Sequence, residues 1–254
     1  MGVGHTHVLY VHEHSPIHAL APEAKIVGAV GVVASAAITP RQAIWAFGLY
    51  AVVVASIVAI SRVPPRFLAI RLLALTPFVL FALLIPFVAS GETIDVLGVP
   101  LSVEGLWGSW NILIKALIGG SVSIVLTATT EIPEIIRGLG LLRVPAVMTS
   151  IATFMIRYIE LTVDELSRMR LAMTARGYDP GWLAQARPIA NAAGALFVRS
   201  YERGERVHDA MLSRGFTGVM PGFGSRSATS TEWAQVGVVI SMCVLTVTVA
   251  LVVK

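Results

Sequence analysis

The chain has 254 residues, of which 56% are hydrophobic and only 13% are charged, and its mean hydropathy is +0.78. Because about a quarter of the residues of a soluble domain are charged, this composition excludes an ordinary soluble protein and predicts a polytopic protein of the lipid bilayer. The net charge of +4 fits loops that face anionic lipid, so it gives no reason to expect a nucleic-acid partner. The single cysteine, Cys243, excludes a disulfide framework and a cluster of thiolate metal ligands.

The first 23 residues form a histidine-rich segment. Five of the six histidines of the chain fall within it: His5, His7, His12, His14 and His18. Imidazole suits borderline metals such as Co²⁺, Ni²⁺ and Zn²⁺, so these residues are weak candidates for metal contact. The alternative is a solvated tail with incidental histidines, because a spacing of two residues does not place a pair on one helical face. The sequence leaves both interpretations open.

Five apolar stretches approach the length of about 20 residues that a helix needs to cross a bilayer. Four lie within the region 24–128 and the last within 233–254, and their approximate limits are 24–39, 42–61, 67–90, 107–128 and 233–252. The third contains Pro77 and Pro86, which we expect to kink it. Small residues permit close helix contacts, either inside the chain or with a neighbouring subunit. They include Gly28, Gly31, Ser35, Gly119, Gly120 and Ser123.

Lys115 and Asn111 lie one turn apart inside the fourth stretch. A charge in the hydrocarbon region costs about 2.5 kcal/mol or more on insertion scales, so such a residue is expected to face protein or water. Two interpretations remain. Lys115 extends toward the outer interface or pairs with an acidic neighbour, or it lines a substrate path.

Charge is concentrated in one block between the fourth and fifth stretches. Residues 128–232 hold most of the arginines and most of the acidic residues of the chain. The short loop at 62–66 carries two arginines, whereas the loop at 91–106 is acidic and has no basic residue. The positive-inside rule therefore places the loop at 62–66 and the charged block in the cytoplasm. Counting crossings then puts the N-terminus inside and the C-terminus outside.

The charged block divides into a helical module at 129–216 and a loop at 217–232 that is rich in Gly, Ser and Thr. Within the module we predict helices at about 131–142, 144–176 and 187–214. The second has an apolar first half and a charged second half, which predicts a helix that leaves the membrane surface for the cytoplasm. Its apolar stripe consists of Met155, Ile159, Val163, Leu166, Met169 and Met173.

One short sequence motif occurs twice in this module, at an offset of 38 residues. Ala172–Tyr178 reads AMTARGY and Ala210–Phe216 reads AMLSRGF. A glycine directly after the last helical residue takes the left-handed conformation that ends a helix, so each copy predicts an arginine held at a helix end. One such ending is common, but two with shared Ala, Met, Arg, Gly and aromatic residues predict two equivalent contacts with a partner.

In these contacts the guanidinium groups would donate hydrogen bonds to acidic or carbonyl-lined grooves, and the aromatic rings would add apolar anchors. The candidate partner-binding residues are Ala175, Arg176, Gly177, Tyr178, Ser213, Arg214, Gly215 and Phe216.

We find no motif for nucleotide binding or catalysis in the sequence. It has no phosphate-binding loop of the form G-x-x-x-x-G-K-[ST], and no Gly-Lys pair at all. His12-Glu13-His14 is not the helical zinc-protease motif, and no Ser/His/Asp arrangement is readable. We therefore expect a chain that is not an enzyme and binds no cofactor itself.

The order of four spans, a charged helical module and a last span resembles the transmembrane T component of energy-coupling factor (ECF) transporters, especially the cobalt-type CbiQ proteins. Ala175-Arg176-Gly177 and Ser213-Arg214-Gly215 look like the paired X-Arg-X coupling motifs of that family. Ser15–Lys25 is similar to the entry segment of the cobalt type, although Ala19 and Ala21 stand where a charged residue is often found. The resemblance covers nearly the whole chain.

This resemblance implies an all-α protein of the cell membrane, with about five transmembrane helices and a cytoplasmic module of amphipathic coupling helices between the fourth and fifth spans. It implies three partners: two ABC-type ATPase subunits, which hold ATP and Mg²⁺ and each receive one arginine, and a small membrane subunit that holds the transported Co²⁺ or Ni²⁺. Two other hypotheses remain. The chain is the shared T component of a vitamin importer, or it is a self-contained secondary transporter or channel, which Lys115 and the kinked third stretch motivate.

Overall fold

The computed structural model describes residues 11, 13, 15–90, 92–96, 99–178, 187–218 and 226–252. By its internal contacts the chain divides into two units. We name residues 7–141 together with 226–254 the membrane unit, and residues 142–225 the helix-pair unit.

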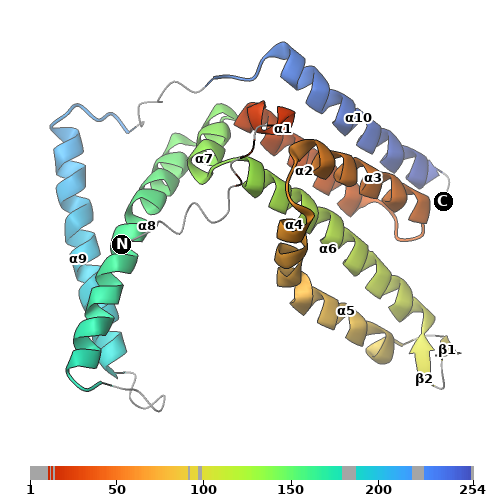
Figure 1. The fold of residues 1–254 in the computed structure, drawn as a ribbon, viewed down its shortest axis with the longest axis horizontal. Helices are drawn as coiled ribbons and strands as arrows, with labels where there is room; N and C mark the ends of the chain where they lie inside the picture. The colour runs from red at the N-terminus through yellow and green to blue at the C-terminus, as the bar shows by residue number, and fades with distance from the viewer. Residues whose placement is uncertain are drawn as a thin grey trace. The chain divides into compact units, whose positions relative to one another are not determined.

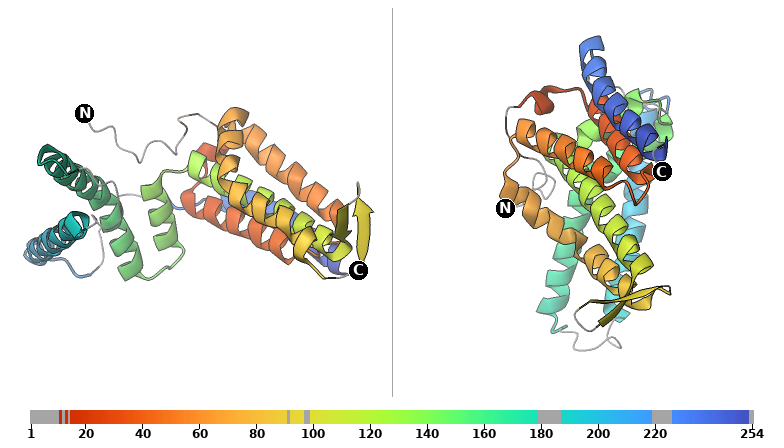
Figure 2. Two further views of the ribbon diagram at one scale, coloured as in Figure 1. Left: turned by 90° about the horizontal axis from the view of Figure 1, so that it is seen from below. Right: turned by 90° about the vertical axis from the view of Figure 1, so that its right-hand side faces the viewer.

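Both units are built from helices (Figures 1 and 2). The membrane unit contains α1 (Pro16–Ala19), α2 (Pro22–Ile38), α3 (Ile44–Ser61), α4 (Pro65–Leu72), a 3₁₀ turn (Leu73–Leu75), α5 (Thr76–Val88), β1 (Thr93–Val96), β2 (Val99–Ser102), α6 (Val103–Thr129), α7 (Ile132–Leu141) and α10 (Ser230–Val252). The helix-pair unit contains α8 (Ala146–Ala175) and α9 (Arg187–Leu212). The predicted all-α membrane fold is confirmed, and the antiparallel hairpin of β1 and β2 is an addition that the sequence analysis missed.

Five helices in the described part of the chain are long and apolar enough to cross a membrane, which indicates a multi-pass membrane protein. Four correspond to predicted spans: α3, the stretch from α4 to α5, α6 and α10. The fifth is α8, the least apolar of the set, which the sequence analysis assigned to the charged module.

The first predicted span is α2, which has 17 residues and falls just short of that length. It starts at Pro22 and ends before Pro40, because proline suits a first helical turn and disfavours a helical residue before it. Despite its length, α2 packs against α10 and α6 in the membrane unit.

The two prolines of the third predicted span have different effects. The helix breaks at the 3₁₀ turn just before Pro77, so the predicted kink there is a change from α4 to α5. Pro86 lies inside α5 and removes the hydrogen bond that the carbonyl of Ala82 would otherwise accept. The hydroxyl of Ser109 on α6 donates to that carbonyl at 2.6 Å. A neighbouring helix thus satisfies the backbone group that proline leaves free.

Two of the predicted small residues, Gly31 and Gly120, serve packing inside the chain, which is one of the two alternatives left by the sequence. A Cβ at Gly31 of α2 would lie 2.8 Å from Cγ1 of Ile240 on α10, and a Cβ at Gly120 of α6 would lie 2.8 Å from Cδ1 of Leu75. Tyr50 of α3 is fully buried in the same bundle. Its hydroxyl donates to the carbonyl of Cys243 at 3.2 Å, so one polar contact joins α3 to α10.

Lys115 takes a partner that neither interpretation of the sequence foresaw. Its Nζ donates to the carbonyl oxygen of Ala37 at 2.7 Å, in the last turn of α2. A cation is favourable at a helix C-terminus because the last carbonyls are unpaired and the dipole is negative there. Lys115 therefore holds α6 to the end of α2, and the observation that suggested a substrate path has a structural explanation.

Candidate functional site

The two copies of the repeated motif lie at the C-terminal ends of the two helices of the helix-pair unit. α8 ends at Ala175 and α9 at Leu212, and each is followed by a glycine with a positive φ angle, 79° at Gly177 and 80° at Gly215. Both glycines therefore have the left-handed conformation that the sequence predicted. We call residues 173–178 and 211–216 the two tips.

The tips share one pattern of backbone hydrogen bonds. In the first, Gly177 N donates to Thr174 O at 2.9 Å and Tyr178 N donates to Met173 O at 3.1 Å. In the second, the corresponding bonds run from Gly215 to Leu212 at 2.9 Å and from Phe216 to Met211 at 3.0 Å. This pair of bonds defines the Schellman motif, which satisfies the last carbonyls of a helix. The sequence repeat is thus a structural repeat.

The cap accounts for the repeated methionine, glycine and aromatic residue, but not for the arginine. A Schellman motif commonly brings together an apolar residue in the last turn and another two positions past the cap. Met173 with Tyr178, and Met211 with Phe216, occupy those positions and are half-buried. Arg176 and Arg214 are exposed, and neither forms an ion pair with any residue that the structure describes. Because the backbone alone makes the cap, the arginines are available for a partner.

The two tips lie at opposite ends of the helix pair (Figure 1). α8 and α9 run antiparallel, since Met211 near the end of α9 lines the same groove as Phe154 near the start of α8. Arg176 lies 22 residues beyond Phe154 on α8, and Arg214 lies three residues beyond Met211 on α9. Because a helix rises 1.5 Å per residue, the two arginines lie roughly 35–40 Å apart. One partner site cannot accommodate both arginines over that distance.

A three-residue charge cluster joins α8 to α9 in the middle of the pair. Glu165 of α8 is buried, and its carboxylate accepts hydrogen bonds from Arg203 at 2.8 Å and from Arg199 at 3.2 Å, both on α9. We call these three residues the Glu165 clamp. Glu165 was not predicted from the sequence, because helical spacing alone does not show which of two neighbouring acids, Asp164 or Glu165, meets the second helix.

The apolar stripe predicted on α8 is largely uncovered. Met155 is 67% exposed and Ile159 is 54% exposed, and Val163 and Leu166 are also exposed. Contiguous apolar surface of this kind marks a contact with another protein or with a membrane. The helix-pair unit therefore presents two charged tips and one apolar face.

Of the five N-terminal histidines, four (His5, His7, His12 and His14) lie outside the described residues. His18 is described, and both of its ring nitrogens have partners. Nε2 lies 3.1 Å from the carbonyl oxygen of Val11, and Nδ1 lies 2.7 Å from Oγ of Ser15. Since a carbonyl only accepts, a neutral ring carries its proton on Nε2 and accepts from Ser15. These contacts give His18 a structural role at the start of the membrane unit.

Alanine at Gly215 is expected to fray the end of α9. A Cβ is strained at this φ angle, at a cost of roughly 1–2 kcal/mol. Gly194→Ala is the matched control, because it lies inside the same helix with no atom within 4 Å of the added Cβ; there alanine should stabilise the helix by about 0.5–1 kcal/mol. Amide hydrogen exchange in the last turn of α9 measures both effects. Equal protection in the two variants would contradict the role of Gly215 in the cap.

Acid is expected to destabilise the membrane unit through His18. Burial lowers the pKa of His18 below its ordinary value of 6.5, so the folded chain binds this proton less readily than the unfolded chain. The contribution to stability is complete above pH 6.5 and declines as the pH falls toward the folded-state pKa. A thermal melt of the purified chain in detergent should therefore shift downward between about pH 7.5 and about pH 5. His18→Asn should reduce that shift, and His208→Asn on α9 is the control; identical shifts in both would refute the assignment.

The sequence matches the CbiQ family, described as cobalt transport protein, over residues 13–223. It is 30% identical over 173 residues to the energy-coupling factor transporter transmembrane protein EcfT 1 of Listeria monocytogenes, covering 62% of each chain. It is 26% identical over 133 residues to the cobalt transport protein CbiQ of Rhodobacter capsulatus, covering 52% of this chain and 54% of the relative. A putative fused cobalt transport protein CbiMQ of Methanocorpusculum labreanum is 28% identical over 109 residues, which are 43% of this chain and 18% of the relative.

The chain thus spans less than two thirds of the length of each of these relatives. The family match, however, extends over most of the chain and includes both α8 and α9 with their tips. It also includes the three helical stretches before α8 that are long and apolar enough to cross a membrane, and the entry segment at Ser15–Lys25. With five helices able to span a membrane, this chain is a multi-pass membrane protein that belongs to the CbiQ family of cobalt transport proteins.

Proposed function

We propose that the chain is the transmembrane coupling subunit of an ATP-driven ECF-type importer, which links two ABC-type ATPase subunits to a small membrane subunit that binds the substrate. The observation that carries this proposal is the pair of tips. Two identically capped helix ends each present one exposed arginine, and they stand at opposite ends of one helix pair. Two equivalent tips suit two equivalent receptors, one on each ATPase subunit.

The geometry of the helix pair supports a mechanical role. When two ATPase subunits close around ATP, their receptor grooves approach each other, and tips docked in those grooves must move with them. The Glu165 clamp joins α8 and α9 near their midpoints, so a displacement at one tip is passed to the other helix. The helix pair therefore converts closure of the ATPases into a tilt or slide of its own axis.

The exposed apolar stripe on α8 is the proposed contact with the substrate subunit or the membrane surface. Movement of the tips would shift Met155 and Ile159, which lie on this stripe, and so displace the subunit that holds the substrate. In this account the chain catalyses no reaction and binds no cofactor. ATP and Mg²⁺ bind the partner ATPases, and the substrate subunit holds the cargo, which we propose is Co²⁺, with Ni²⁺ as the alternative metal.

The proposed orientation follows from the charges of the loops. The N-terminal segment and the helix-pair unit face the cytoplasm, where the ATPases are, and the C-terminus faces outside. The pair of arginines at Arg62 and Arg66 and the acidic residues at Glu92 and Glu104 support this assignment by the positive-inside rule.

Purification of the tagged chain from its native membrane in mild detergent tests the proposal. We expect two ABC-type ATPase subunits and a small membrane protein to co-purify, and the complex to accumulate Co²⁺ in proteoliposomes only when ATP is supplied. A chain that purifies alone and transports Co²⁺ with an ion gradient would instead be a secondary transporter.

The shared T component of a vitamin importer is the second candidate. It is motivated by the 30% identity to the energy-coupling factor transporter transmembrane protein EcfT 1 of Listeria monocytogenes, whose name states no metal. The same purification separates the two candidates, because a shared component would co-purify with several substrate subunits and their substrates would compete for uptake. Uptake of Co²⁺ alone would favour the first.

A further inference from the structure

The two chain segments that join the units both attach to the first turn of α2. α7 ends at Leu141, immediately before the helix-pair unit begins, and residues 226–229 follow immediately after it ends. Both segments belong to the membrane unit and contact α2 within it. We call α7 the leaving segment and residues 226–229 the returning segment. The first turn of α2 therefore holds the chain both where it leaves the membrane unit and where it returns to it.

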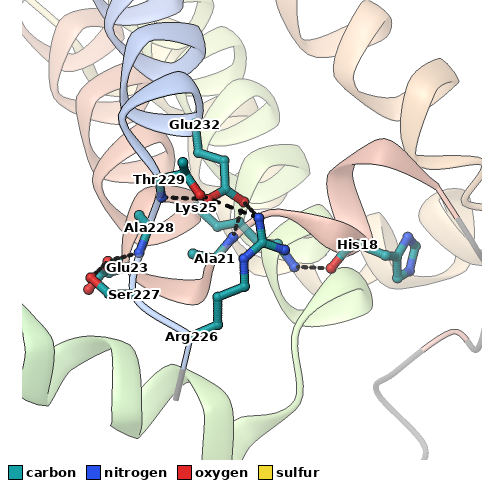
Figure 3. Close-up of polar contacts among 9 residues, drawn as sticks. All are labelled: His18, Ala21, Glu23, Lys25, Arg226, Ser227, Ala228, Thr229 and Glu232. Carbon is teal, nitrogen blue, oxygen red and sulfur yellow. Dashed lines mark hydrogen bonds and ion pairs between the residues drawn. The ribbon is translucent and has the colours of Figure 1, made fainter. Parts of the chain in front are cut away.

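Two carboxylates, one on α2 and one on α10, join the returning segment to α2 (Figure 3). Glu23, in the first turn of α2, accepts hydrogen bonds from the backbone N–H of Ala228 and, at 3.3 Å, from the hydroxyl of Ser227. Glu232, in the first turn of α10, accepts from the backbone N–H of Ala21 at 3.2 Å, just before α2. Each helix thus contributes a carboxylate to the backbone at the start of the other.

Glu232 also fixes the local start of α10. Its Oε2 accepts from the backbone N–H of Thr229 at 2.7 Å, which is one half of a capping box, and Arg226 lies 3.4 Å from its Oε1. Because the same carboxylate binds Ala21 and Thr229 (Figure 3), the start of α10 cannot shift away from α2 without breaking hydrogen bonds to a buried charge.

The leaving segment is held by close packing. Gly138 of α7 lies against the first turn of α2, where a Cβ would approach Glu23 N and the carbonyl carbon of Pro22 to 3.1 Å each. Lys25 of α2 holds the end of α6, which lies just before α7 in the chain. Its Nζ donates to the carbonyl of Thr129 at 2.9 Å and to the carbonyl of His18 at 3.1 Å. We call Glu23, Gly138, Ala228 and Glu232 the α2 clasp.

Buried charge is concentrated around the first turn of α2, which indicates that the α2 clasp does more than pack helices together. Four charged residues are buried in the described part of the chain, and three of them, Glu23, Lys25 and Glu232, lie here. Burying a charge is costly unless it is paired and hydrogen-bonded. An apolar joint would hold the helices together with less cost, but charged hydrogen bonds fix direction and register as well as distance.

We propose that the α2 clasp is the point through which movement of the helix-pair unit enters the membrane unit, and that Glu23 is a positioning residue for this coupling. The inference rests on the proposed function. Without the α2 clasp, movement of the tips would be taken up by bending of the two connecting segments. With it, both segments pull on α2 together, and α2 passes the displacement to α10 and α6, against which it packs.

Glu23→Ala and Glu23→Gln test the proposal in proteoliposomes that contain the chain with its co-purified partners. The alanine variant removes the acceptor for Ala228, whereas glutamine keeps a side-chain oxygen that accepts the same hydrogen bond. We expect Glu23→Ala to retain its ATPase partners and their rate of ATP hydrolysis but to take up severalfold less Co²⁺ per ATP hydrolysed. Glu23→Gln should restore most of that ratio, and Glu205→Ala, an exposed acid on α9, should leave it unchanged.

Gly138→Ala addresses the leaving segment and remains decisive if Glu23→Ala fails to assemble. The added methyl group must push α7 away from the backbone of α2, whereas Gly119→Ala makes only an ordinary contact of 3.9 Å with Val33. We expect a reduced ratio of Co²⁺ uptake to ATP hydrolysis for Gly138→Ala alone. Uptake and hydrolysis that fall in proportion, with less assembled complex, would show a merely structural role and overturn the proposal, as would an unchanged ratio. Failure of the proposed function would appear separately, in the wild-type chain, as missing ATPase partners.

Discussion

Replacement of both Arg176 and Arg214 by alanine is expected to abolish ATP-driven uptake and the co-purification of the ATPase subunits. Each guanidinium is exposed at the end of a rigid cap that needs no arginine for its own hydrogen bonds. An arginine anchor in a protein interface contributes about 2 kcal/mol or more, or about 30-fold in the dissociation constant. Because the tips are far apart, the two losses should be independent, and each single variant should keep partial attachment.

The matched control for this experiment is the double variant Arg168→Ala with Arg206→Ala. These arginines occupy α8 and α9 at the same offset of 38 residues, and both are exposed. The control removes the same charge from the same helices without touching either tip. Arg206 is 3.8 Å from Glu202, an exposed pair that contributes little to stability. Equal loss of attachment in the control would mean that net charge, and not the tips, holds the ATPases.

Replacement of Glu165 by alanine is expected to separate the two helices of the pair and to remove most of the uptake. Arg199 and Arg203 would lose their shared carboxylate and be left as like charges beside each other. The ATPases should still bind, because both tips remain intact. Hydrogen exchange along α9, measured on the purified chain, should rise across Arg187–Leu212.

Asp164→Ala is the control for the Glu165 clamp. Asp164 is the adjacent acid on α8 and is exposed, so its removal changes the charge equally without opening the helix pair. Faster exchange along α9 in both variants, or in neither, would show that the Glu165 clamp does not hold the pair together.

The parts of the site that the sequence predicted are those set by local geometry. A glycine after a helical stretch determines its own backbone conformation, so the caps at Gly177 and Gly215 could be read without any tertiary information. The limits of α8 and α9 followed in the same way, from proline and from helical spacing. The assignment of the two arginines to ATPase partners stays a prediction.

The parts that the sequence did not predict depend on contacts between distant residues. Glu23 and Ala228 lie at opposite ends of the chain, and Lys115 meets a backbone carbonyl, which has no signature in the sequence. The pattern Thr229-x-x-Glu232 is a capping-box signature that would have predicted one bond of the α2 clasp. It would not have shown that Glu232 also binds Ala21, because that contact arises only when α2 and α10 pack together.

The central claim is that each tip receives one ATPase subunit, and native mass spectrometry of the purified complex tests it most directly. The wild-type chain should carry two ATPase subunits, and Arg176→Ala and Arg214→Ala should each carry one, with none on the double variant. Retention of both ATPase subunits by the double variant, or loss of both in either single variant, would contradict the claim.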